Sequence, residues 1–211
     1  MKKNKKLILI STIVCLLPIL LSITLYDKLP SSIAIHFSAS GQPNNYAPKF
    51  IAAFGLPIIM AISNALCIFV LDKDPKKENS SKVLNQICLW IIPILSITLT
   101  PITLFKSLGT DIPINIIVPA MIGILFVVIG NYLPKCKQNN TVGIKLPWTL
   151  KDSDNWNKTH HLAGYLWILG GAIVTISTFL NSILTSYIMF IAIGVMVLVP
   201  TIYSYAIYKN K

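Results

Sequence analysis

The chain has 211 residues, of which 54% are hydrophobic and only 12% are Asp, Glu, Lys or Arg. Charged residues make up about a quarter of a typical soluble domain. A soluble core could not hide this much apolar surface, so the composition excludes a soluble domain and favours a membrane protein. The net charge of +11 comes from 18 basic residues, all lysines between apolar runs, and because no nucleic-acid-binding motif accompanies them we expect no direct contact with nucleic acid.

Six long apolar runs follow one another along the chain, each close to the roughly 20 residues that a helix needs to cross a bilayer. They cover approximately residues 7–25, 50–71, 87–105, 112–133, 162–180 and 187–207, and none contains Asp, Glu, Lys, Arg or His. A membrane-spanning backbone must satisfy its own polar groups, and these runs lack the alternation of barrel strands. The sequence therefore predicts an all-α membrane protein with six transmembrane helices.

The first run, residues 7–25, follows a lysine-rich start and so resembles a secretory signal peptide. Its length of about 19 residues exceeds the usual signal core of 7–15 residues. The nearest small-residue cleavage pattern, at residues 32–34, also lies well beyond its end. We therefore expect an uncleaved membrane anchor.

The first connection, residues 27–49, has a pattern of its own. Ile33, Ile35 and Phe37 alternate with Ala, His and Ser, which predicts a short strand. The Ser-Gly-Gln-Pro-Asn-Asn cluster at residues 40–45 predicts a turn. His36 could bind a ligand or respond to pH. It could equally be a loop histidine that only makes a hydrogen bond.

The lysines between the spans predict the orientation, because cytoplasmic connections are enriched in them. With the N-terminus inside, 15 lysines are cytoplasmic and 3 are external. The internal set is Lys2, Lys3, Lys5, Lys6, Lys73, Lys76, Lys77, Lys82, Lys135, Lys137, Lys145, Lys151, Lys158, Lys209 and Lys211, and the external set is Lys28, Lys49 and Lys106. Both termini are therefore expected on the cytoplasmic side.

The long inner connection, residues 130–164, contains two tryptophans, Trp148 and Trp156, which suit the membrane interface. Its lysines, Lys145, Lys151 and Lys158, are placed to contact anionic lipid headgroups.

A helix is expected to begin within this connection and to continue into the fifth span, with Ser153 or Asp154 as its N-cap. On that helix Trp156, His160 and Gly164 are four residues apart and share one face.

The sequence contains no motif for catalysis, metal or cofactor binding. It lacks HExxH, GxSxG and P-loop patterns, and its four cysteines form no CxxC pair. The adjacent His160 and His161 would point about 100° apart on a helix. We expect a protein that is not an enzyme and binds no cofactor. A small transporter or exporter is the alternative function. It is less favoured, because the spans hold no ionisable residue of the kind that ion-coupled carriers use.

The inner connection resembles the signature of the SdpI family of bacterial immunity proteins. The elements are a Gly-Asn pair at the end of a span, a Leu-Pro followed by Lys, an Asn, a Gly-Ile-basic-x-Pro-Trp-Thr core, a Trp and a His. Here they are Gly130, Asn131, Leu133, Pro134, Lys135, Asn139 or Asn140, Gly143, Ile144, Lys145, Pro147, Trp148, Thr149, Trp156 and His160 or His161. The family usually has Arg at the position of Lys145. Lysine keeps the positive charge but cannot bind a ligand at two points as the planar Arg group does.

The first connection looks like the small module that often precedes the family domain. It carries that module's Leu-Pro, Ile-His-Phe and Gly-x-Pro elements at Leu29, Pro30, Ile35, His36, Phe37, Gly41 and Pro43. We accordingly divide the chain into an N-terminal module, residues 1–80, with two helices and the outer loop 27–49, and an SdpI-like domain, residues 81–211, with four helices and the inner loop 130–164.

The resemblance implies a multi-pass protein of the bacterial plasma membrane that gives immunity to a secreted antimicrobial peptide toxin. Some members are also implied to relay the toxin's presence to a cytoplasmic transcriptional repressor. The expected partners are therefore membrane lipids, a peptide on the outer face and a repressor on the inner face. The residues expected to bind toxin or partner are His36, Phe37, Gly41, Pro43, Asn131, Pro134, Lys145, Pro147, Trp148, Trp156 and His160.

Overall fold

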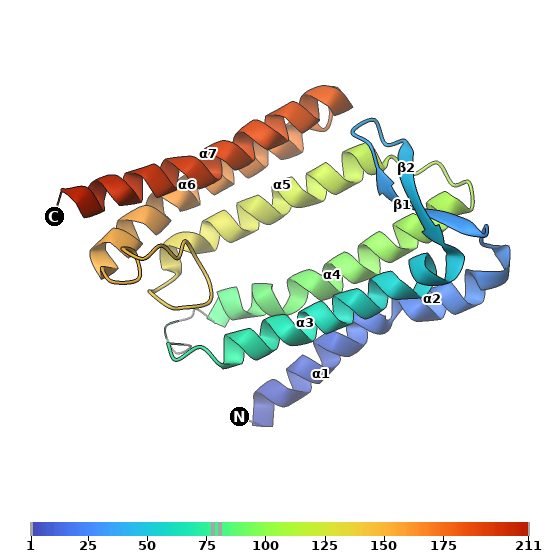
Figure 1. Cartoon of the computed structure of the whole chain (residues 1–211), viewed down its shortest axis with the longest axis horizontal. Coiled ribbons are helices and arrows are strands. Elements are labelled where there is room, and N and C mark those ends of the chain that lie inside the picture. The colour runs from blue at the N-terminus through green and yellow to red at the C-terminus, as the bar shows by residue number, and fades with distance from the viewer. Residues whose placement is uncertain (1, 77–78, 80–81, 211) are drawn as a thin grey trace. The chain divides into compact units, whose positions relative to one another are not determined.

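The structure is a computed structural model that describes residues 2–76, 79 and 82–210. Within them the chain forms α-helices α1 to α7 and one antiparallel hairpin, β1 and β2 (Figure 1). The helices are α1 (Lys2–Leu16), α2 (Pro18–Leu25), α3 (Leu56–Asp72), α4 (Lys82–Ser107), α5 (Ile114–Tyr132), α6 (Ser153–Ser177) and α7 (Ser182–Lys209), and the strands are β1 (Ser32–Phe37) and β2 (Pro43–Pro48). The predicted all-α class is confirmed.

Five helical stretches within the described residues are long and apolar enough to cross a bilayer. They are Lys6–Lys28, Ile51–Asp72, Val83–Ser107, Ile114–Lys135 and Ser182–Lys209, and they match five of the six predicted runs. The run predicted at residues 162–180 lies largely in α6. That helix begins at Ser153, and its first turns are rich in Asn, Lys and His, so it is not among the five. The chain is an all-α, multi-pass membrane protein.

Some sequence-based expectations concern residues outside the described part of the chain. These are Lys77 and Lys211 in the orientation argument, the side chains of Lys2, Lys3, Lys5 and Lys82, and residues 80 and 81 at the expected domain boundary. The orientation and the domain division stay predictions. By backbone contacts the chain groups into two units, one of Met1–Val70 with Gln86–Ile114 and one of Leu71–Asn85 with Asn115–Lys211.

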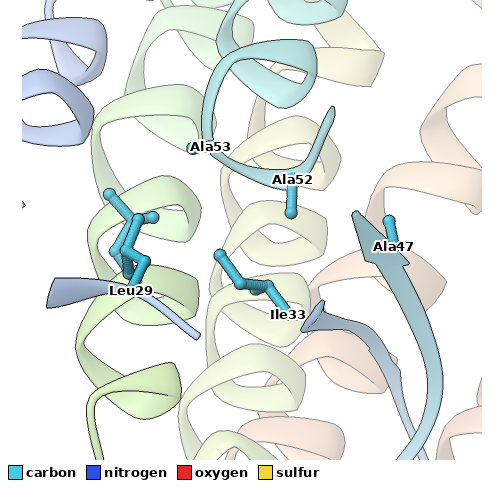
Figure 2. Close-up of a cluster of buried hydrophobic side chains, with 6 residues drawn as sticks. Leu29, Ile33, Ala47, Ala52 and Ala53 are labelled. Carbon is cyan, nitrogen blue, oxygen red and sulfur yellow. The ribbon is translucent and has the colours of Figure 1, made fainter. Parts of the chain in front are cut away.

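The first unit has an apolar core where the hairpin meets the helices. Its buried members are Leu29, Ile33, Ala47, Ala52, Ala53 and Leu104. Figure 2 shows Leu29 and Ile33 beside the turn that carries Ala52 and Ala53. The small side chains of Ala52 and Ala53 let the strand approach the helix closely. Burying a side chain the size of Ile33 contributes about 1.5–3 kcal/mol to the stability of the fold. The hairpin is therefore anchored to its unit.

The hairpin confirms the predicted strand and corrects the predicted turn. β1 covers the alternating segment, but the turn occupies residues 38–42 instead of 40–45, because β2 already begins at Pro43. Ser32 pairs with Pro48, and the register is irregular between Ala34 and Phe37. Gly41 has φ 78°, a left-handed conformation that glycine adopts without cost.

Polar side chains join the spans of the first unit. Ser96 on α4 donates a hydrogen bond to the Cys15 carbonyl at 2.7 Å. Asn64 on α3 donates to the Ser11 hydroxyl at 3.1 Å. Interhelical hydrogen bonds of this kind hold membrane helices together in the absence of a hydrophobic drive.

The second unit packs α5 and α7 against α6 through small residues. A Cβ atom on Gly123 of α5 would lie 2.7 Å from the Gly171 carbonyl oxygen of α6, and one on Gly130 would lie 2.9 Å from the Gly164 carbonyl oxygen. Only glycine allows backbones this close. On the other side of α6, Gly170 faces the Met196 side chain of α7. Gly170 and Gly171 therefore permit close contact of α6 with both neighbouring helices.

Candidate functional site

The connection between α5 and α6 is ordered by hydrogen bonds from its own side chains. Asn139 is buried, and its Oδ1 accepts from the backbone N–H groups of Thr141 at 2.9 Å and Val142 at 2.7 Å. The buried Thr149 hydroxyl accepts from the Leu146 N–H at 2.9 Å. Such side chains supply the partners that loop backbone otherwise lacks. Two polar residues of the family-like core therefore shape the loop.

Trp156 and His160, on the first turns of α6, form the buried centre on which this loop packs, both with 0% exposure. Their rings stack with centroids 4.0 Å apart. The Trp156 indole N–H donates to the Cys136 carbonyl at 2.6 Å. His160 Nδ1 donates to the Trp156 carbonyl at 2.7 Å, and His160 Nε2 accepts from the Ile144 N–H at 2.9 Å. Both ring nitrogens are thus used by a neutral imidazole.

Burial lowers the pKa of His160 to about 4. The main cause is the loss of hydration of the charged ring, which the hydrogen bond to the Trp156 carbonyl only partly offsets. Repulsion by His161 lowers the pKa slightly further. His160 is therefore neutral at physiological pH and holds the loop in place instead of transferring protons.

Gly143 is required where the loop passes over these two rings. Its φ is +117°, a conformation that side chains with a Cβ atom rarely adopt. A Cβ atom there would collide with His160 Nε2 and would lie 3.0 Å from two ring carbons of Trp156. The glycine allows the backbone to approach closely enough for the adjacent Ile144 N–H to reach the imidazole.

Asp74, in the connection after α3, clamps this loop from outside. Its carboxylate accepts from the Asn140 N–H at 3.0 Å, from the Thr141 hydroxyl in a short contact, and from the Lys76 N–H at 2.8 Å. Burial opposes the charge, but these hydrogen bonds outweigh it and lower the pKa of Asp74. Sequence reasoning missed Asp74, because it lies 66 residues from Asn140 and belongs to no motif.

Trp148 and Asn155 join the loop to α7. The Trp148 indole N–H donates to the Ser204 hydroxyl at 2.8 Å, and that hydroxyl donates to Asn155 Oδ1 at 2.8 Å. Trp148 also stacks on Tyr208 and meets Tyr205 edge to face. The partly exposed Trp148 is compatible with the interfacial position that the sequence predicted.

Two details of the predicted inner connection were wrong. Trp156 is enclosed by protein and its indole N–H donates to the loop backbone, so its side chain does not contact lipid headgroups. The N-cap of α6 is Asp152, whose carboxylate accepts from the N–H groups of Asp154 and Asn155. The predicted shared face is confirmed, since Trp156, His160 and Gly164 are all buried.

The remaining inner candidates divide into packed and exposed residues. Pro134 packs against Gly164, where a Cβ atom would lie 2.6 Å from its ring. Asn131, Lys145 and Pro147 are exposed. The hydrogen-bonded loop therefore presents Lys145 and Pro147 to its surroundings.

The outer candidates also have different roles. His36 is exposed, and its Nδ1 lies 2.6 Å from Asn44 Oδ1 across the hairpin, so it is hydrogen bonded within the loop. Gly41 forms the turn. Phe37 and Pro43 line a hollow of about 450 Å³ beside the hairpin. Of the four outer candidates, Phe37 and Pro43 line this hollow.

Comparison with known proteins places these two segments in recognised modules. The model of the SdpI/YfhL protein family matches residues 135–204, and that of the domain of unknown function DUF1648 matches residues 13–61. The protein named Immunity protein SdpI from Bacillus subtilis (strain 168) is 30% identical over 213 residues, which cover 100% of this chain and 98% of that protein. The chain belongs to the SdpI family. No solved structure matches it.

The SdpI match coincides with the second unit's ordered loop and the two helices that follow. It contains Gly143, Trp156 and His160, which contact one another, and Ser204, which holds Trp148. Asp74 lies outside both matched segments. The residues of the SdpI signature are thus mainly those that build the loop.

Replacing Asp74 by asparagine is expected to loosen this loop. The amide can accept fewer strong hydrogen bonds than the carboxylate, and losing charge-assisted bonds of this kind costs roughly 1–3 kcal/mol. Hydrogen exchange at the amides of Asn140 and Thr141 should become faster in Asp74→Asn. The exposed Asp27 is the matched control, and Asp27→Asn should leave that exchange unchanged. Unchanged exchange in Asp74→Asn would show that the clamp contributes little.

Proposed function

We propose that this chain is a membrane immunity protein that protects its cell from a secreted antimicrobial peptide toxin, without enzymatic chemistry of its own. The observation that carries the proposal is the 30% identity with an immunity protein along practically the entire length of both chains. Similarity of that extent includes both the hairpin and the inner loop. It favours a shared role over the mere sharing of a fold.

The arrangement of polar and apolar groups supports binding more than chemistry. His160 is neutral and fully hydrogen bonded, and the other polar groups of the inner loop hold its backbone. Within the described residues no three His, Cys, Asp or Glu side chains gather as metal ligands. The hairpin is anchored by a buried core on one side and exposed on the other. In this proposal the hairpin meets the toxin on the outer face.

The proposal extends to the inner face. There the hydrogen-bonded loop, with exposed Lys145 and Pro147, meets membrane lipid headgroups and provides the docking surface for a transcriptional repressor. Relay of a signal requires two conformations with different affinities for toxin. A repressor that binds only one of them would then report the toxin's presence.

The test is survival of a toxin-sensitive bacterium that expresses the chain. The cells are challenged with the secreted peptide fraction of the source bacterium and with purified membrane-active peptides. Cells with the chain should survive concentrations that kill cells carrying an empty vector. If they die equally, with the chain shown by immunoblot to be in the membrane, the immunity function is wrong. Substrate flux in vesicles would then test the alternative, a small transporter or exporter.

A further inference from the structure

The hairpin and the end of α4 border the hollow of about 450 Å³. Its lining includes Ala34 and Phe37 of β1, Tyr46 of β2, Thr103 and Lys106 of α4, and Asp111 of the following connection. All of these residues belong to the first unit. The size falls within the range of ligand pockets, which is about 300–1,000 Å³. Apolar and aromatic groups make up half of the lining, and hydroxyl groups with one cation and one carboxylate make up the other half, a mixture that can fix the orientation of a ligand.

Lys106 is the cationic group of this lining. It is half-buried, and its ammonium donates to the Ile112 carbonyl at 2.9 Å. Within the described part of the chain no carboxylate forms an ion pair with it. An ammonium has three donors, so Lys106 keeps donors for an anionic ligand. Asp111, the acidic group of the lining, is exposed and remains hydrated.

The opposite surface of the hairpin has fewer features of a ligand-binding site. Ile35 is exposed on β1 but does not line the hollow, and His36 already contacts Asn44. A single exposed apolar side chain is ordinary on a protein surface. The hollow, in contrast, combines concave shape, aromatic lining and an unpaired cation.

We propose that this hollow is the docking site of the peptide toxin. An apolar side chain of the peptide occupies the part lined by Phe37 and Tyr46, and a carboxylate of the peptide pairs with Lys106. The inference rests on the immunity function proposed above, and it locates the binding site on the first unit instead of on the SdpI signature loop. A cation beside the aromatic part of the lining selects a peptide that carries both features, because an apolar chain alone would leave Lys106 without an anionic partner.

Filling the hollow tests the location. Ala34→Trp places an indole in the hollow, and Ile35→Trp places the same side chain on the exposed surface of the same strand. The probe is the secreted peptide fraction of the source bacterium, applied to sensitive cells with equal amounts of each variant in the membrane. Ala34→Trp should lower the tolerated concentration by about tenfold, the effect of losing one well-packed contact. Ile35→Trp should protect like the wild type.

Changing the charge tests the chemistry with little risk to folding. Lys106→Gln should lower the tolerated concentration by about fivefold, and Lys106→Arg, which keeps the cation, should retain protection. Lys28→Gln removes an exposed lysine on the same predicted side and should have no effect. Protection that depends equally on Lys28 and Lys106 would indicate general attraction to the surface and would overturn the pairing with Lys106.

Cysteine labelling measures occupancy directly in intact cells. An impermeant maleimide should label Ala34→Cys, and prior addition of the peptide fraction should slow that labelling but not the labelling of Ile35→Cys. Failure of the wild type to protect would overturn the immunity function and this inference with it. Wild-type protection that persists in Ala34→Trp and Lys106→Gln, without slower labelling, would overturn the docking site alone.

Discussion

Replacing Gly143 by alanine is expected to lower the free energy of unfolding by about 3 kcal/mol, one of the largest effects of any single methyl group in this chain. Two costs add. A residue with a Cβ atom is strained at φ +117°, and the new atom would collide with the imidazole of His160 and press on Trp156. Neither ring can move without breaking its own buried hydrogen bonds. The thermal midpoint in detergent, followed by circular dichroism, measures the loss.

Two other glycines separate the two costs. Gly109 also has a positive φ, +90°, but a Cβ atom there meets nothing within 4 Å. Gly109→Ala should therefore cost only the backbone strain, about 1–2 kcal/mol. Gly194 lies in α7 with open space around it, and Gly194→Ala should be neutral or slightly stabilising. If Gly143→Ala lost no more stability than Gly109→Ala, the close packing of the loop on His160 would be contradicted.

Acid should destabilise the chain through His160 before it affects the carboxylates. The folded state holds the pKa of His160 at about 4, below its ordinary value of 6.5. Below pH 6.5 the unfolded chain therefore binds a proton that the folded chain does not. The free energy of unfolding is therefore unaffected by this histidine above pH 6.5. It decreases as the pH falls toward 4, and the decrease reaches about 3 kcal/mol at pH 4.

Thermal unfolding measured at intervals from pH 7 to pH 4 tests this dependence. His160→Gln should be less stable at pH 7 but should lose much less stability on acidification. The exposed His161 is the control, and His161→Gln should change the wild-type profile only slightly, because His161 is a minor cause of the lowered pKa of His160. The lowered pKa of Asp74 acts only below its ordinary value of 3.8, so it does not interfere in this range. A wild-type midpoint that is constant between pH 6.5 and 4 would contradict the neutral, buried state of His160.

The resemblance and the structure assign different meanings to the signature residues. The resemblance implies that Trp156 and His160 are among the residues that bind toxin or partner, whereas both are enclosed and fully hydrogen bonded. Any effect they have on binding must pass through the loop that they support. Variants at these two positions should therefore be read together with a stability measurement.

The sequence by itself determined the membrane class and the positions of the long helices. It also determined the strand at Ile33 and the shared face of Trp156, His160 and Gly164. These features depend on hydropathy and on the 3.6-residue or two-residue period, which are local properties of the chain. The resemblance added the family, because it depends on the order of residues and not on their contacts.

Only the tertiary structure decided what those residues touch. The second strand at Pro43 has no alternating pattern and forms because β1 is there to pair with it. The start of α6 at Ser153 depends on a cap at Asp152, one residue before the nearer of the two predicted caps. The clamp of Asp74 on Asn140, the burial of Trp156 and the space that Gly143 leaves for His160 all join segments that lie apart in the sequence. No local pattern encodes them, because a hydrogen bond or a close contact between distant segments depends on where the helices bring the chain.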